Sequence, residues 1–165
     1  MLIEHLILIG MWVIGFASFL LFVPRKKWRR GLMAILVFQA WIWLFDMPAF
    51  QLDWLTAPVR ELPKATDLPL TIDYFFYPVL FSIYYVNKKV MSSQWYEILY
   101  FFAWVSVITL FDVCIERYTD LLEYGYLTWY WMWLYLGFLF YISRVCCSLF
   151  YNEKASFLID WRLGK

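Results

Sequence analysis

The chain has little of the chemistry that supports metal binding or catalysis. Its 165 residues include one histidine, His5, and three cysteines without a CxxC pair. A single imidazole excludes a bis-histidine haem and a multi-histidine metal site within one chain, and three cysteines give no disulfide framework. The motifs GxGxxG, GxxxxGK[ST], GxSxG and HExxH are absent. We therefore predict no metal and no cofactor, and an enzyme is the less favoured class.

Charged residues are also scarce. They make up 16% of the chain, against about 25% in ordinary soluble domains. The formal net charge is +1, which gives no electrostatic reason to expect nucleic acid as a partner. The one dense basic cluster, RKKWRR at 25–30, contains a tryptophan and is better suited to an anionic membrane surface.

Apolar residues, in contrast, make up 64% of the chain and aromatic residues 24%. They form five long runs, and a helix of about 20 apolar residues crosses the roughly 30 Å core of a bilayer. The sequence therefore predicts one all-α membrane domain over residues 1–165. The expected spans are 2–23, 31–50, 72–86, 96–118 and 129–151. The span 72–86 is short and contains Pro78, so the sequence leaves open whether it crosses fully.

The basic residues predict an orientation. The cluster at 25–30, the pair Lys88–Lys89 and the C-terminal tail carry most of the positive charge, which favours the cytoplasmic side. The N-terminus is then outside and the C-terminus cytoplasmic. The segment 51–70 contains three prolines, which oppose a continuous helix, and is expected to be an external loop.

Acidic residues at the outer ends of the second and fourth spans are the candidates for a site. Asp112, Glu116, Asp120 and Glu123 fall at i, i+4, i+8 and i+11, a spacing that places them on one face of a helix. Charges in hydrocarbon require partners or water. We predict an outward-facing pocket for a proton, a cation or a headgroup. Its members are Asp46, Asp112, Glu116, Arg117 and Arg60. The alternative is that these residues form structural ion pairs or lie among the headgroups.

A second set of residues is expected to contact lipid. These residues are Arg25, Lys26, Lys27, Arg29, Arg30 and Arg144, and Arg144 lies in the last turns of the fifth span. Such side chains extend to the membrane surface or bind lipid phosphate. Gln39 and Ser106 are polar within apolar spans, and we expect each to form an interhelical hydrogen bond.

Several short sequence features resemble those of a poorly characterised family of small multi-spanning membrane proteins of endospore-forming Bacillota. The matching features are Asp46, then "APVRELP" at 57–63, Pro78, Glu116 and "YGYLTWYWMWLY" at 124–135. The resemblance covers the second to fifth spans, and the first span and its basic joint are outside it. It implies a bacterial plasma membrane location, with the spore inner membrane as the alternative, and a similar topology. It implies no activity.

Three functions stay open on the sequence. The first is a bacterial membrane protein that acts as a subunit or a homo-oligomer through helix and lipid contacts. Small residues on the first span, such as Gly10 and Gly15, favour such close packing. The second is a proton or cation pathway through the acidic pocket. The third is a protein that binds or modifies lipid headgroups.

Overall fold

The computed structural model describes residues 2–59, 61, 68–88, 94–125 and 128–151. It contains five α-helices: α1 (Leu2–Phe22), α2 (Trp28–Gln51), α3 (Tyr77–Asn87), α4 (Gln94–Tyr118) and α5 (Trp129–Phe150). A 3-10 turn (Arg25–Lys27) joins α1 to α2, and a π-helix (Leu70–Phe76) leads directly into α3. The predicted all-helical architecture is confirmed. The sequence did not predict a short antiparallel ladder, which pairs β1 (Leu55–Thr56) with β2 (Glu123–Tyr124).

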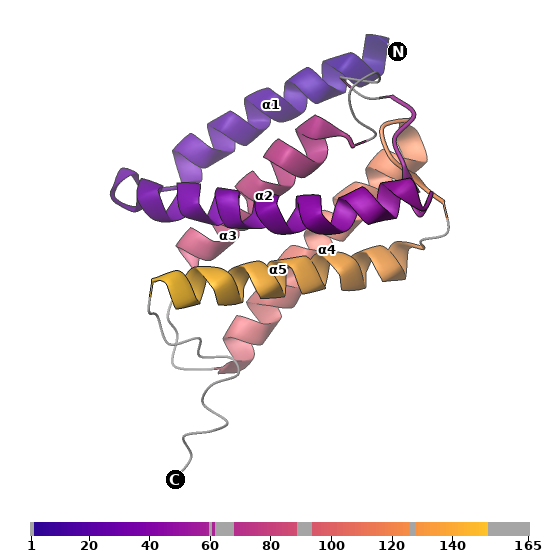
Figure 1. Cartoon of the computed structure of the whole chain (residues 1–165). Coiled ribbons are helices and arrows are strands. Elements are labelled where there is room, and N and C mark those ends of the chain that lie inside the picture. The colour runs from indigo at the N-terminus through magenta and orange to yellow at the C-terminus, as the bar shows by residue number, and fades with distance from the viewer. Residues whose placement is uncertain (1, 60, 62–67, 89–93, 126–127, 152–165) are drawn as a thin grey trace.

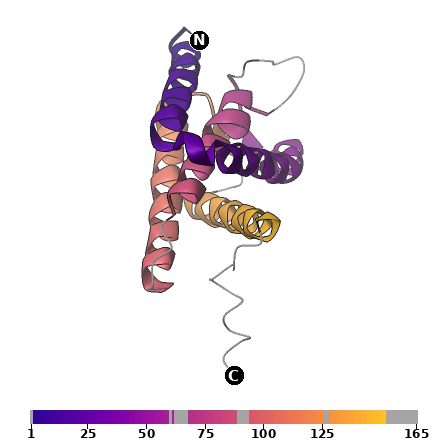
Figure 2. The same ribbon diagram turned by 90° about the vertical axis from the view of Figure 1, so that its left-hand side faces the viewer.

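The shortest helix, α3, occupies the centre of the bundle (Figures 1 and 2). Figure 2 shows it with α2 and α5 on one side and α1 and α4 on the other. Nearly all of its residues are buried, including Tyr77, Phe81 and Tyr84. Because the neighbouring helices cover it, α3 is surrounded by protein rather than by solvent or lipid.

The outer helices present the opposite pattern. In the described part of the chain, α1, α2, α4 and α5 are each long and apolar enough to cross a membrane. Large apolar side chains lie exposed along them, with Leu21 79% exposed on α1 and Leu99 69% exposed on α4. Exposure of so much apolar surface to water would be unfavourable, whereas contact with lipid tails is not. This distribution is typical of an integral membrane protein.

The contacts between helix ends define two opposite ends of the bundle. At one end, which we call the basic end, Lys27 Nζ donates to the Val86 carbonyl at 3.1 Å and Tyr151 lies beside Arg29. At the other end, the acidic end, the β1–β2 ladder joins the segments that follow α2 and α4. Consecutive helices therefore run in alternating directions, as Figure 1 shows.

Pro78 explains the π-helix that precedes α3. Proline has no N–H, so the carbonyl of Tyr74, four residues earlier, loses its usual helical donor. The backbone N–H of Tyr77 instead donates to the carbonyl of Ile72, a π-type bond. The side-chain amide of Gln39 on α2 donates to the freed Tyr74 carbonyl. The predicted interhelical hydrogen bond of Gln39 is therefore confirmed, and its partner is a backbone group.

Two further polar contacts join helices. The Trp133 indole on α5 donates to Ser106 Oγ on α4 at 3.0 Å, which confirms the interhelical bond predicted for Ser106. The Trp12 indole on α1 donates to Thr71 Oγ1 at 2.8 Å, and its ring stacks on Phe75 with centroids 4.0 Å apart. These contacts hold α1 against the start of the π-helix and α4 against α5.

The Tyr74 carbonyl gives a stability prediction. Gln39→Leu should lower the free energy of unfolding by about 1 kcal/mol, because it removes the side-chain donor to a half-buried carbonyl. Thermal or denaturant unfolding of the purified protein in detergent measures this loss. In a Pro78→Ala background the loss should shrink, since residue 78 then offers an N–H of its own. Equal losses in the two backgrounds would refute this assignment of the Gln39 contact.

Candidate functional site

Three aspartates converge inside the acidic end. Asp46 comes from α2, Asp73 from the π-helix and Asp112 from α4. They are 3%, 5% and 0% exposed, and they lie close enough for their charges to act on one another. We call these three residues the acidic cluster. Buried carboxylates are expensive unless hydrogen bonds or opposite charges compensate them.

Tyrosine hydroxyls provide the hydrogen bonds. Tyr77 and Tyr124 donate to the two carboxyl oxygens of Asp112, the second at 3.1 Å, and Tyr135 on α5 donates to Asp46 Oδ1. Tyr124 belongs to β2, so the β1–β2 ladder positions one of the donors. Burial, with the Asp112 charge nearby, raises the pKa of the Tyr124 hydroxyl. The hydroxyl therefore stays protonated and acts as a donor.

Asp73 is compensated differently. Its carboxyl group lies near the Asp46 carboxyl in the buried interior. Its Oδ2 atom is buried and has no hydrogen-bond partner within the described residues. Two carboxylates can only accept hydrogen bonds, so a bond between two carboxyl groups requires one of them to carry a proton. The Asp46–Asp73 pair is therefore chemically suited to hold a proton.

Two further acids lie between the cluster and the surface. Glu61, in the segment after β1, accepts the backbone N–H of Thr71 at 3.0 Å, which holds it over the start of the π-helix. Its other oxygen, Oε2, is buried and has no partner in the described part of the chain. Glu116 is half-buried on α4, one turn after Asp112. Further carboxyl groups thus lie near the cluster at the acidic end.

The structure brings together part of the predicted pocket. Asp46 and Asp112 lie in the cluster and Glu116 at its margin, whereas Arg117 is exposed at the end of α4. Arg60 is outside the described residues. The expectation that four acids share one helix face is wrong, since α4 ends at Tyr118. Asp120 follows the helix, and Glu123 lies in β2.

Sequence reasoning missed Asp73, Tyr77 and Tyr135 as members of the site. One signal was available for the first two, because Asp73 and Tyr77 are four residues apart within an apolar segment. Tyr135 gave no such signal, because it is one of many aromatic residues in α5.

A second polar network lies at the basic end. Arg144 on α5 forms an ion pair with Glu97 at the start of α4, with Nη2 2.7 Å from Oε2. Lys88 lies 3.3 Å from the same carboxylate, and the Arg144 guanidinium also donates to the Tyr84 hydroxyl at 3.3 Å. This network joins α3, α4 and α5.

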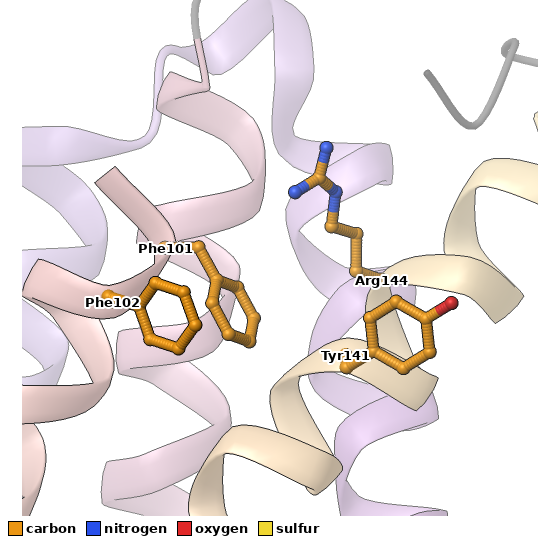
Figure 3. Close-up of a pocket in the computed structure, with 4 residues that line it drawn as sticks. All are labelled: Phe101, Phe102, Tyr141 and Arg144. Carbon is orange, nitrogen blue, oxygen red and sulfur yellow. The ribbon is translucent and has the colours of Figure 1, made fainter. Parts of the chain in front are cut away.

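The position of Arg144 corrects a prediction. The sequence suggested that Arg144 extends to the membrane surface or binds lipid phosphate, but the residue is 7% exposed and is paired inside the protein. With Phe101, Phe102 and Tyr141 it lines a pocket of about 40 Å³ between α4 and α5, and Figure 3 shows its guanidinium extending away from the three rings. The neighbouring carboxylate of Glu97 makes this buried position favourable, because a charge in an apolar interior requires a counter-charge.

The other basic residues predicted at the membrane surface lie as a group at the basic end. All five are exposed: Arg25, Lys26, Lys27, Arg29 and Arg30. Helix α2 begins at Trp28, so the last two belong to its first turn and not to the joint. The Arg30 guanidinium also lies over the Tyr151 ring, 5.2 Å from its centroid.

Neither site has the ligand arrangement of a metal centre. Within the described residues, no three histidine, cysteine, aspartate or glutamate side chains are grouped so that they could hold a metal ion. Comparison with protein-family models, curated proteins and solved structures finds no match to this chain. The resemblance to the Bacillota membrane proteins therefore stays a prediction from sequence motifs.

The Arg144–Glu97 pair gives a second stability prediction. Glu97→Gln should destabilise the protein by about 3–5 kcal/mol, because it removes the charged carboxylate that pairs with a buried guanidinium. The double variant Glu97→Gln with Arg144→Met should recover much of the loss. Unfolding in detergent measures both. A double variant that is less stable than Glu97→Gln alone would contradict this account of the pair.

Proposed function

We propose that this chain is a bacterial multi-pass membrane protein that transfers protons through the acidic cluster. The observation that supports the proposal is the convergence of three buried carboxyl groups from three helical segments. Tyrosine hydroxyls donate hydrogen bonds to two of them, Asp46 and Asp112. A protein that needed these residues only for stability would be expected to pair them with cations, as it does at Glu97.

A proton fits this cluster better than the other candidate occupants. The carboxyl oxygens of Asp112 already accept two hydroxyl hydrogen bonds, which disfavours direct coordination of a cation. Phosphate headgroups are disfavoured because, among the described residues, the cluster and its rim groups Glu61 and Glu116 are acidic. A proton, by contrast, relieves the repulsion between neighbouring carboxylates and needs almost no space.

The membrane arrangement we propose has five spans. The π-helix and α3 together form the third, since seven and then eleven residues run as one helical segment between the two ends. The basic end faces the cytoplasm by the positive-inside rule, with the N-terminus outside. The acidic cluster then opens outward. The membrane is the bacterial plasma membrane, or the spore inner membrane if the family resemblance applies.

A second candidate function is that of a subunit or homo-oligomer. Helix α1 packs mainly against α3 and the π-helix, and most of its remaining surface is exposed and apolar. A side chain added at Gly10 would meet no atom within 4 Å, whereas one at Gly15 would meet Phe75. Gly10 thus belongs to a surface that another helix could approach closely.

The topology can be tested by labelling. In a background without the three native cysteines, Trp28→Cys and Lys88→Cys should both be protected from a membrane-impermeant maleimide applied to intact cells. Asp120→Cys should react. Trp28→Cys and Lys88→Cys on opposite sides of the membrane would refute the five-span arrangement.

Proton transfer can be tested with the full chain in liposomes that contain a pH-sensitive dye. Under an imposed potential, liposomes that contain the wild-type protein should acidify faster than empty liposomes. Asp112→Asn should reduce the flux to the empty-liposome rate, because the amide cannot exchange a proton. Asp120→Asn is the matched control, since this exposed acid lies outside the cluster, and its flux should equal that of the wild type.

The folding of the Asp112→Asn variant must be measured together with its proton flux. Size-exclusion elution and thermal unfolding of Asp112→Asn establish whether a loss of flux has a chemical cause. A wild-type rate equal to that of empty liposomes would exclude proton transfer as the function. A folded Asp112→Asn variant with wild-type flux would exclude Asp112 from the route.

A further inference from the structure

Three phenylalanines fill the middle of the bundle. Phe38 on α2, Phe81 on α3 and Phe140 on α5 are each 0% exposed. Their ring centroids are 5.0 Å apart for Phe38–Phe81, 5.2 Å for Phe81–Phe140 and 5.4 Å for Phe38–Phe140. Each ring therefore touches both of the others, and the three close the centre of the helix bundle. We call them the phenylalanine septum.

The septum separates the two polar sites. On α3, Tyr77 contacts the acidic cluster and Tyr84 contacts Arg144, and Phe81 lies between them. Seven helical residues correspond to about 10 Å along the axis. On α5, Phe140 similarly lies between Tyr135, which contacts Asp46, and Arg144. An apolar layer about 10 Å thick is thus the main barrier between groups that exchange protons at one end and ionised groups at the other.

Buried polar atoms without partners lie on both sides of this layer. On the side of the acidic cluster they are Asp73 Oδ2 and Glu61 Oε2, and on the other side Ser143 Oγ, one residue before Arg144. Ser143 is 0% exposed, and none of these atoms has a hydrogen-bond partner in the described part of the chain. Buried groups of this kind are rare and are suited to bind water.

We infer that the phenylalanine septum is the gate of the proton path, which enters at Glu61, passes the acidic cluster and continues at Ser143 toward the basic end. The inference rests on the proposed proton transfer. With the rings packed, no water chain can cross the apolar layer, and an apolar constriction of this kind blocks ions by excluding water. When the rings separate, water connects the sides. A proton then leaves a carboxyl group of the cluster as hydronium and passes along the water chain, and the carboxylate left behind is reprotonated through Glu61.

The gate is tested by making the rings smaller. In the same liposome assay, Phe140→Leu and Phe140→Ala should raise the proton flux above the wild-type rate, severalfold for alanine and less for leucine. The control is Phe138→Ala, because Phe138 is on the same helix and is 47% exposed. It should leave the flux unchanged. The leucine variant retains most of the volume, so it reports on the gate even if the alanine variant does not fold.

A double variant separates the gate from a nonspecific leak. Phe140→Leu combined with Asp112→Asn should return to the empty-liposome rate, since the cluster still supplies the protons. A flux that persists in the double variant would overturn the inference. The inference would also be overturned if Phe140→Leu and Phe140→Ala fold and show the same flux as the wild-type protein. That outcome would leave the proposed proton transfer intact. The experiment thereby distinguishes failure of the gate proposal from failure of the proposed function, because in the second case the wild-type protein shows no flux.

Discussion

The interaction on which the acidic end depends is the donation of tyrosine hydroxyls to buried carboxyl groups. A carboxylate in an apolar interior must be compensated, and here the donors come from three different places in the fold. Tyr77 follows the π-helix, Tyr135 lies on α5, and Tyr124 is placed by the β1–β2 ladder. The segments that connect the helices at the acidic end therefore also position a donor, because they bring Tyr124 to Asp112.

The two ends of the bundle use different compensation for a buried acid. Glu97 at the basic end is paired with Arg144 and Lys88, so its charge is neutralised by permanent cations. The Asp46–Asp73 pair has a neighbouring carboxyl group instead, and only a proton relieves their repulsion. A paired carboxylate is suited to holding helices together, whereas a cluster of acids that has no cation among its described neighbours is suited to exchanging protons. The septum keeps these two environments apart.

Hydropathy was sufficient to predict the four long helices, because apolar runs of membrane length are a strong signal. The interhelical roles of Gln39 and Ser106 were also predictable, since a polar group in an apolar helix needs a partner. The inward direction of Arg144 was not predictable, because its partner Glu97 lies 47 residues away in the chain. Asp73 was missed for the same reason, since its neighbour Asp46 is also distant in the chain. The π-helix that contains Asp73 departs from the α-helical period of 3.6 residues per turn.

This departure connects the proline of α3 to the chemistry of the site. A π-helical turn holds about one residue more than an α-helical turn, which shifts the preceding residues by about 100° around the axis. Without that shift, Asp73 would face a different side of the segment and not Asp46. The shift requires the Tyr74 carbonyl to give up its helical donor, which Pro78 enforces and Gln39 makes acceptable. A residue that weakens the third helix thus places the third carboxyl group in the cluster.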